Sequence, residues 1–440
     1  MADIFPRRPV AALLALCLGG GLALGGCGGT DDAADGTVTL TFWDNNGGPT
    51  RTPLWEHIIA EFQQANPTIR VKYVGIPIAQ AQQKYNTAVA AGGLPDVGGV
   101  STAYVAELAA QKALVPLDDL VAGSPELNGK LVPGFVETLR NTVPDNKLYI
   151  VPQTGNMDTI WYRKDWFTKE GVAAPATWDA FFAAARKLTD SSRNRYGFTI
   201  RGGAGSSFQF IAEMYAYSGI TTIFDEAGKS TVDDPRNVEA LKKIVALYDK
   251  QTPKADVNND FPKMVAQFVG GSIGMMHHNL GSYQDHVKAF GADNVGFAPL
   301  PPSPATGTYT IASNPVGGVA VFASGKHRDA ARRFAAFVGS AAQNSYWTRN
   351  TGELPANTAV RDEAWISETP AGKALAILSD PKTKVVPLPY FLPEFNANVK
   401  ADLEPIYQKV LLGQETVENF LARLAALLNE AHTKWRARQK

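Results

Sequence analysis

The stretch Tyr85-Asn-Thr-Ala-Val-Ala-Ala-Gly-Gly-Leu-Pro-Asp-Val97 joins a predicted helix to a predicted strand. Its first half continues a helical pattern that starts near Gln80. Gly92-Gly93 is expected to end this helix, because glycine readily adopts the backbone conformation of a helix C-terminus. Pro95-Asp96 then leads into a strand at Val97. The stretch therefore predicts a helix-to-strand step of an α/β unit.

The residues before this stretch repeat the same step. Thr37–Trp43 alternates polar and apolar residues, as a half-buried strand does, and residues 69–73 alternate in the same way. Between them, Thr52 as N-cap and Pro53 at the first helical position predict a helix. This alternation of strands and helices predicts an α/β fold in which a parallel sheet carries helices on both faces.

A second series of elements begins after residue 152. The 440 residues are about three times a common domain length of roughly 150 residues, so two lobes are expected. The predicted elements are a helix capped by Thr177, a helix starting at Asp234-Pro235, and the strands Thr159–Tyr162, Tyr196–Ile200, Ser272–His277, 294–300 and Gly317–Ala323.

The charge and composition exclude several classes of protein. Lys and Arg number 42, as do Asp and Glu, so the net charge is zero and a nucleic-acid partner is not expected. With 45% hydrophobic and 19% charged residues, the chain can bury a sizeable core and is not globally disordered.

Residues 1–26 are predicted to form a signal peptide. Arg7 and Arg8 precede the uncharged run Val10–Leu24, which is short for a membrane span and suits a signal-peptide apolar region. The run closes with Leu24-Gly-Gly-Cys27, which resembles a bacterial lipobox. Cys27 is therefore expected to carry a lipid at the outer face of the cytoplasmic membrane, with residues 27–36 as the anchor and a flexible tether. The alternative is a weak membrane anchor with an incidental cysteine.

The stretch at residues 85–97 also resembles the signature of the family 1 extracellular solute-binding proteins, the sugar-capturing components of ABC importers. Further similar blocks follow in order and cover nearly all of residues 38–360. They are Gln111–Asp118, Tyr162–Phe167, Pro175–Trp178, Gly271–Met276, Pro299–Pro301, Gly317-Gly318 and Thr351–Pro355.

This resemblance implies two α/β lobes of the periplasmic-binding-protein type, with ligand in the cleft between them and hinge closure on binding. The first lobe is expected to comprise residues 37–150 and 310–360, and the second residues 151–309 and 361–440. The implied role is capture of a carbohydrate by a monomer, and its delivery to ABC permease subunits driven by a cytoplasmic ATPase. No catalysis and no cofactor are expected.

Ligand contacts are expected in loops just beyond the strands, where open parallel sheets bind ligands. Carboxylates and amides together satisfy the donor and acceptor faces of sugar hydroxyls, and aromatic rings pack on pyranose C–H faces. Small residues beside an arginine allow close backbone approach. The candidates are Asp44, Asn45, Asn46, Tyr104, Asp158, Arg201, Gly203, Asn279, Gly318, Tyr390, Phe391 and Glu394.

Several candidates have a structural alternative. Asp44–Asn46 also suits a polar turn, the glycines after Arg201 suit a flexible turn, and Tyr390, Phe391 and Glu394 suit packing between lobes. The adjacent residues His277 and His278 invite a metal site, but neighbouring strand residues point to opposite faces, so no metal is expected.

Two other functions stay open at this point. The ligand is either a neutral carbohydrate or a polyol phosphate or glycerophosphodiester, for which Arg201 would be the anion partner. A secreted glycoside hydrolase is a distant alternative, because two cleft carboxylates are what that chemistry uses.

Overall fold

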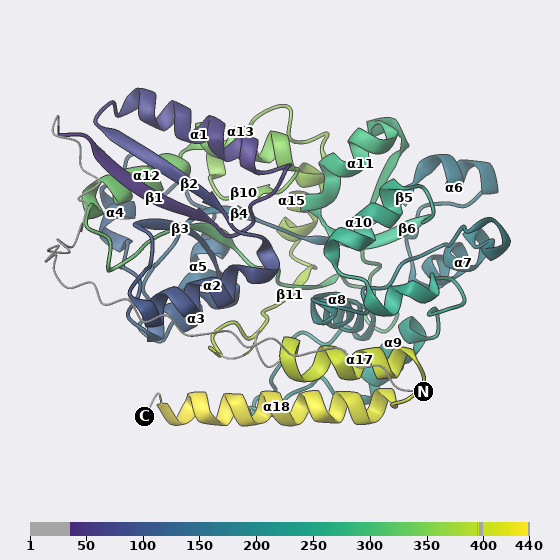
Figure 1. The fold of residues 1–440 in the computed structure, drawn as a ribbon. Coiled ribbons are helices and arrows are strands. Elements are labelled where there is room, and N and C mark those ends of the chain that lie inside the picture. Colours follow the sequence, from purple (N-terminus) through teal and green to yellow (C-terminus); the bar gives the residue numbers. More distant parts are fainter. Residues whose placement is uncertain (1–35, 394, 396–398, 439–440) are drawn as a thin grey trace, which may run out of the picture.

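The computed structural model describes residues 36–393, 395 and 399–438, which form two lobes side by side (Figure 1). The first lobe is built on one six-stranded sheet. Its strands are, in spatial order, β10 (Leu354–Pro355), β4 (Val151–Gly155), β9 (Gly317–Val321), β3 (Val97–Ser101), β1 (Val38–Asp44) and β2 (Ile69–Gly75).

Strands β1, β2 and β3 are parallel, as the sequence predicts. The returning strand β9 instead runs antiparallel to β3 and to β4, and β10 is antiparallel to β4. The sheet is therefore mixed. Its helices are α1 (Thr52–Ala65), α2 (Ile78–Ala91), α3 (Thr102–Ala110), α4 (Asp118–Gly123), α5 (Pro133–Asn141), α12 (Arg328–Val338), α13 (Ala341–Thr351) and α14 (Thr358–Arg361).

Alternation along the strands divides this lobe into two apolar layers. Leu40 and Phe42 join one buried cluster with α1 and α12, whereas Trp43 faces a second cluster with Tyr85 of α2 and Tyr104 of α3. The predicted helix end at Gly92 is confirmed, because Gly92 is left-handed and closes α2. The predicted N-cap of α1 is wrong: Arg51 holds the cap position, and the Thr52 hydroxyl instead bonds that of Tyr73.

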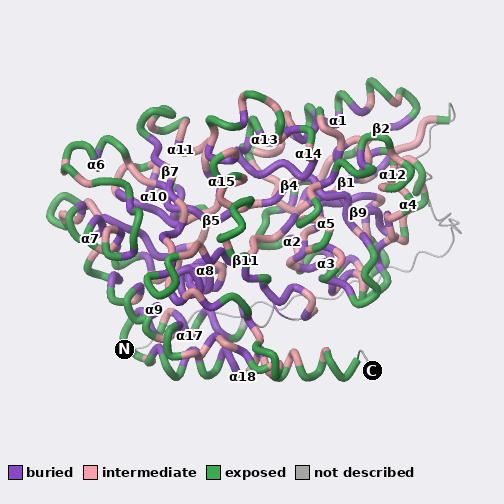
Figure 2. Tube along the Cα trace, turned by 180° about the vertical axis from the view of Figure 1, so that it is seen from behind, coloured by how far each residue is buried: buried purple, intermediate pink, exposed green. Residues whose placement is uncertain are grey.

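The second lobe contains a three-stranded sheet, β6-β5-β7, and a two-stranded sheet, β11-β8. Its main cluster packs α7, α8 and α9 against α17 and α18, and Figure 2 shows the buried strands and α8 inside these helices. The elements are β5 (Asp158–Arg163), α6 (Lys164–Glu170), α7 (Trp178–Leu188), α8 (Ser206–Ser218), α9 (Pro235–Val245), α10 (Phe261–Val269), β6 (Met275–Asn279), α11 (Tyr283–Phe290), β7 (Val295–Pro299), β8 (Thr310–Ala312), α15 (Pro370–Ser379), β11 (Lys384–Val386), α17 (Glu404–Leu411) and α18 (Val417–Arg438).

The caps predicted for this lobe are confirmed. The Thr177 side chain accepts a hydrogen bond at the start of α7, and that of Asp234 does so at the start of α9. The strand predicted at Tyr196–Ile200 is wrong, because only Tyr196 forms an isolated bridge. Backbone hydrogen bonds hold Tyr196 and Phe198, but the amide of Ile200 donates to the Asp256 carboxylate instead of to a neighbouring strand, so no continuous strand forms.

The sheets show where the chain passes between the lobes. Val151–Gly155 belongs to the first sheet and Asp158 opens β5 of the second, so the first crossing is at residues 156–157. Thr310–Ala312 pairs with β11 of the second lobe, so the return crossing is at residues 313–316. We therefore propose lobe boundaries a few residues later than those expected at 150 and 310.

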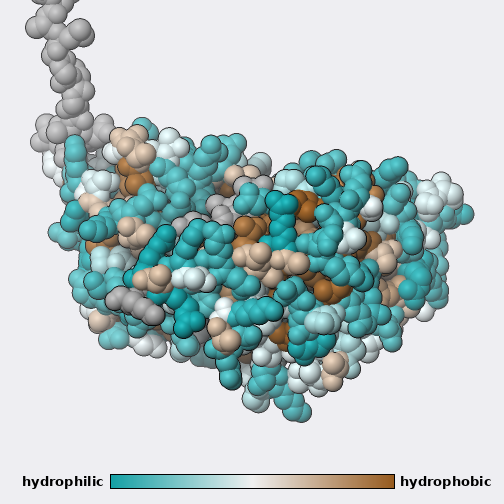
Figure 3. All heavy atoms as spheres, turned by 90° about the horizontal axis from the view of Figure 1, so that it is seen from below, coloured by the Kyte–Doolittle hydropathy of each residue, from teal (hydrophilic) through white to brown (hydrophobic). Residues whose placement is uncertain are grey.

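The surface of the described residues carries few large apolar side chains. Those classed as exposed are Ile78, Val385 and Leu412, and Figure 3 shows a face that is mostly hydrophilic with small hydrophobic groups between. No helix in the described part of the chain is both long and apolar enough to cross a membrane.

Candidate functional site

Asp158 lies where the chain has just entered the second lobe. It opens β5 and pairs in register with Asn279, the last residue of β6. Because these strands are antiparallel, the start of one and the end of the other share an edge of the sheet. Asn314, on the return crossing, lies close enough to act on the Asp158 carboxylate and lower its pKa. Three polar residues from three chain segments thus lie beside the crossings.

The Asp158 carboxylate is largely but not fully buried, with 15% of its side chain exposed. Burial raises its pKa, while the charge of His277, the hydrogen bond from Asn314 and the charge of Arg201 act to lower it. An exposed edge and nearby donors leave this carboxylate able to accept a hydrogen bond from a ligand.

Arg201 is placed by the loop that precedes α8. Its Nε donates to the carbonyl of Ala204 at 2.7 Å, and its backbone amide donates to Gln209 Oε1 at 2.6 Å. Burial lowers the pKa of Arg201 to about 10, against the opposing charges of Glu404, Asp260 and Asp158. The guanidinium is therefore charged at neutral pH and faces carboxylates on several sides.

The glycines after Arg201 pack against protein rather than leaving space for a ligand. The Gly203 amide donates to the Asn259 carbonyl at 2.7 Å, and a Cβ at Gly203 would lie 2.8 Å from that oxygen. Asp256, fully buried beside this loop, accepts hydrogen bonds from Ile200, Thr199, Asn259 and Gln267. Gly203 thus has a packing role that the sequence did not reveal.

Asp44 in the first lobe is committed to its own loop. Its Oδ1 accepts from the amide of Asn46 at 3.0 Å and its Oδ2 from the Tyr73 hydroxyl at 2.9 Å, and the residue is 2% exposed. Burial raises the pKa of this carboxyl. These contacts match the polar-turn interpretation of Asp44–Asn46.

Asn45 and Tyr104 form a polar pair in the first lobe, at the start of α3. The Asn45 side-chain amide donates to the Tyr104 hydroxyl, which donates to the carbonyl of Gly99 at 3.1 Å. Ala103, beside Tyr104, packs against the main cluster of the second lobe. The amide of Thr102 donates to the carbonyl of Val316, so this end of α3 also adjoins the return crossing.

The remaining candidates differ in their surroundings. Tyr390 is buried, donates to the carbonyl of Ser313 at 3.2 Å and lies within electrostatic range of Asp158. Phe391 packs instead against Trp435 of α18, with ring centroids 4.7 Å apart, which is a contact inside the second lobe and not one between the lobes. Gly318 lies inside the sheet, where a Cβ would be 2.0 Å from the carbonyl oxygen of Val151. Glu394 and Cys27 fall outside the described residues.

Sequence reasoning missed Glu353, a buried carboxylate that connects the crossing to the first lobe. It pairs with Arg51 at 2.6 Å and accepts hydrogen bonds from Trp347 and from Asn156 on the first crossing. A Cβ at Gly281 of the second lobe would lie 3.0 Å from its Oε1. The sequence signal that could have identified Glu353 was its position within the block Thr351–Pro355.

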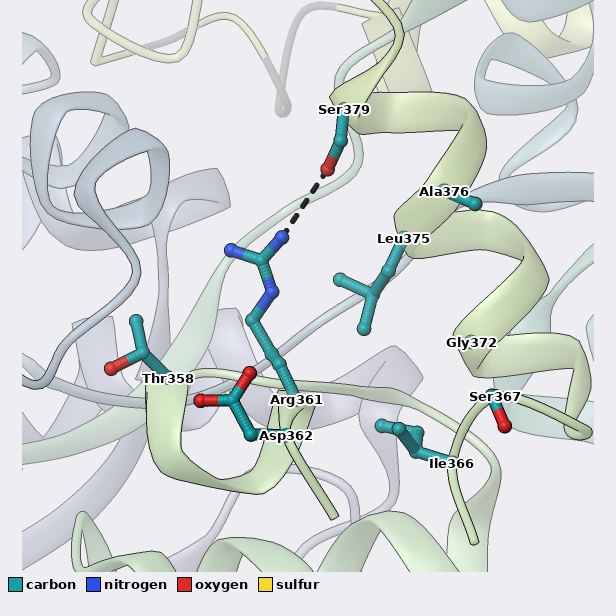
Figure 4. Close-up of a pocket in the computed structure, with 9 residues that line it drawn as sticks. All are labelled: Thr358, Arg361, Asp362, Ile366, Ser367, Gly372, Leu375, Ala376 and Ser379. Atoms are coloured by element: carbon teal, nitrogen blue, oxygen red, sulfur yellow. Dashed lines mark hydrogen bonds between the residues drawn. The ribbon is translucent and has the colours of Figure 1, made fainter. Parts of the chain in front are cut away.

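A pocket of about 340 Å³ lies elsewhere, between α14 and α15 (Figure 4). Arg361 reaches across it and donates to the Ser379 hydroxyl at 3.2 Å. None of the predicted ligand residues lines it. Within the described residues, no three His, Cys, Asp or Glu side chains are grouped to hold a metal ion.

Comparison with known proteins identifies the family. The model of the bacterial extracellular solute-binding protein family matches residues 47–345, well over half of the chain. The chain belongs to this solute-binding family. Members of the family are non-enzymatic transport components. This confirms the prediction that the protein is not an enzyme and excludes the glycoside hydrolase alternative.

Individual relatives agree with this assignment. A protein of Brucella abortus (strain 2308), named as a binding protein, is 26% identical over 358 residues, 80% of this chain and 82% of its own length. A solute-binding protein of Agrobacterium vitis S4 solved with D-mannitol is 30% identical with a TM-score of 0.73, covering 90% of this chain and 98% of that one. The GacH receptor of Streptomyces glaucescens, solved unliganded and with acarbose, is 26% identical with a TM-score of 0.77, covering 91% and 98%.

These structures confirm the two-lobe α/β fold. The chain is the solute-binding component of an ABC transporter, and its structural neighbours bind sugars and polyols.

If Gly318 packs within the sheet, Gly318→Ala should destabilise this solute-binding protein by about 1–3 kcal/mol through overpacking. Gly317→Ala is the matched control, because its Cβ would meet Thr154 Cγ2 at 3.6 Å, an ordinary contact. Urea unfolding measures both variants. Equal stability of the two would contradict the packing role.

Asp256 predicts a pH dependence of folding. Burial raises its pKa to about 7 despite the hydrogen bonds that it accepts. Between the ordinary aspartate pKa and about 7, the Asp256 carboxyl is therefore protonated in the native protein and ionised in the unfolded chain. The contribution of Asp256 to the free energy of unfolding falls as the pH rises through this range. Between pH 5.5 and 8 the loss is about 2 kcal/mol. Asp256→Asn should remove this part of the decline, as denaturant unfolding at both pH values would show; an unchanged decline would refute the assignment.

Proposed function

We propose that this protein captures a neutral carbohydrate or polyol beside the crossings and delivers it to the permease of its ABC transporter. The observation that carries the proposal is the partly exposed Asp158 carboxylate, set among Asn314, Asn279 and Arg201. A sugar or polyol hydroxyl both donates and accepts hydrogen bonds. This arrangement supplies a carboxylate that accepts and amide and guanidinium groups that donate.

Contact with both lobes would make ligand binding favour the closed arrangement. The second lobe contributes Asp158, Arg201 and Tyr390, and the first contributes the Asn45–Tyr104 pair at the start of α3. Asn46 completes the candidate set on the first-lobe side, whereas Gly318 packs inside the sheet. Hinge closure of a monomer around a bound sugar is part of this proposal.

A phosphorylated ligand is the weaker candidate. Arg201 is the cation available for it, but Glu404, Asp260 and Asp158 already act on the Arg201 charge. A phosphate beside Arg201 would bring further negative charge toward these carboxylates, and like charges at close range repel. Neutral hydroxyls meet no such repulsion.

The neighbours also favour small and oligomeric neutral ligands. Structures of this fold were solved with bound D-mannitol, ribitol, tagatose, maltose or maltotriose. Those ligands belong to those proteins, and for this chain they define a screening panel.

The first test is binding to this panel. Among mannitol, ribitol, tagatose, maltose, maltotriose and a glycerophosphodiester, at least one neutral compound should bind in calorimetric titration. Asp158→Asn should weaken that compound about 10- to 100-fold, because a hydrogen bond to a charged group contributes roughly 1.5–3 kcal/mol. Exposed Asp293→Asn is the control. Binding of the glycerophosphodiester alone, or full affinity in Asp158→Asn, would refute this ligand assignment.

The anchor is tested separately. We propose that Cys27 is lipidated and holds the protein at the outer face of the cytoplasmic membrane, as the Leu24–Cys27 ending indicates. Cys27→Ser should release the protein into the soluble extracytoplasmic fraction, measured by fractionation and by labelling with a lipid precursor. A variant that still carries lipid and sediments with membranes would exclude this anchor.

A further inference from the structure

His277 lies directly behind the candidate ligand acid, in the interior of the second lobe. Its Nδ1 is 2.9 Å from Glu213 Oε1, and its Nε2 is 3.8 Å from Asp158 Oδ1. Both His277 and Glu213 are almost completely buried. A histidine thus stands between two carboxylates, one enclosed and one at the surface of the candidate site.

The strand register explains why His277 and not His278 occupies this place. His277 and Asn279 are two residues apart on β6, so they share a face, and Asn279 is the register partner of Asp158. His278 points to the other face, where it stacks on Phe261 and bonds the Ser282 hydroxyl. Glu213 reaches His277 from α8, which covers the first face.

The contacts indicate a protonated imidazole. Glu213 accepts at Nδ1 and, among the described residues, Nε2 has no hydrogen-bond partner while the Asp158 carboxylate lies within ion-pair distance. Burial acts to lower the pKa of His277, but the hydrogen bond and charge of Glu213, with the charge of Asp158, raise it above its ordinary value. A proton on each ring nitrogen lets His277 face both carboxylates favourably.

We propose that His277 is a positioning residue for Asp158: held by Glu213, it presents a positive charge that keeps the ligand-facing carboxylate ionised and oriented. The proposal rests on the proposed function in one respect, the role of Asp158 as a ligand acceptor. The proposal gives His277 and Glu213 a role in ligand affinity, although neither side chain would contact the ligand.

Other charged and titratable groups surround this chain of contacts. Arg201, from the loop before α8, opposes the His277 charge. Tyr390 faces Asp158 and Tyr407 of α17 faces Glu213. Burial raises the pKa of Glu213, which His277 counters. Of these groups, His277 is the cation within ion-pair distance of both acids.

The first experiment needs no ligand. The imidazole of His277 is titrated by NMR in the full-length wild-type protein, and we expect its midpoint to lie above the ordinary histidine pKa of about 6.5. Asp158→Asn, whose altered side chain is at the surface of the site, should lower that midpoint, and Glu213→Gln should lower it further. A wild-type His277 that titrates at or below about 6.5 would overturn the proposal.

The second experiment measures affinity against pH, using whichever panel compound binds the wild type best. In His277→Gln the acid limb of the profile should move to higher pH, so the ratio of the affinities at pH 8 and pH 5.5 should grow, by up to about tenfold for each pH unit of the shift. His278→Gln, from the opposite face, is the matched control. A merely structural role would lower affinity equally at both pH values, and parallel profiles would overturn the proposal. Failure of every panel compound to bind would count against the proposed function, and the NMR titration would still decide the state of His277.

Discussion

The arrangement of the two lobes depends on the ion pair and hydrogen bonds of the buried Glu353 carboxylate. A carboxylate without partners is costly to bury, and here Arg51, Trp347, Thr154 and Asn156 supply the compensation. Arg51 comes from the start of α1, Trp347 from α13, and Asn156 from the crossing itself. One charge therefore fixes the position at which the chain leaves the first lobe, and Asp158 follows two residues later.

Other buried acids hold loops by the same physics. Asp44 fixes the turn after β1, and Asp256 fixes the loop that carries Arg201. In both, donors from the same lobe surround the carboxylate, so the acid is structural. Asp158 differs, because part of its side chain is exposed and its nearest cation is a buried histidine rather than a surface arginine. This difference, which only packing reveals, is our reason for proposing Asp158 as the ligand acid and the other two as structural acids.

The sequence predicted the ends of helices better than the contacts between side chains. Caps at Thr177 and Asp234 and the glycine end of α2 are local signals, so they were predictable from a few residues. The strand predicted at Tyr196–Ile200 failed because Asp256, more than fifty residues away, captures the backbone of Ile200. Glu213 and His277 are also far apart in sequence, and no local pattern pairs them. Asp158 was a candidate from the sequence because it follows a crossing, and its role as a ligand contact stays a prediction.

Under the proposed function, the charges around the site explain how neutral hydroxyls would be selected. Arg201 and His277 are the cations, and Asp158, Glu213, Asp260 and Glu404 are the acids that act on one or both of them. Because the protein already supplies the counter-charges, a ligand needs no charge of its own to leave the buried groups compensated. What it must supply is hydroxyl groups at positions that match Asp158 and its neighbouring donors. On this proposal, a ligand with a displaced hydroxyl would leave a buried group unpaired, and that penalty, rather than a charge match, would set the discrimination.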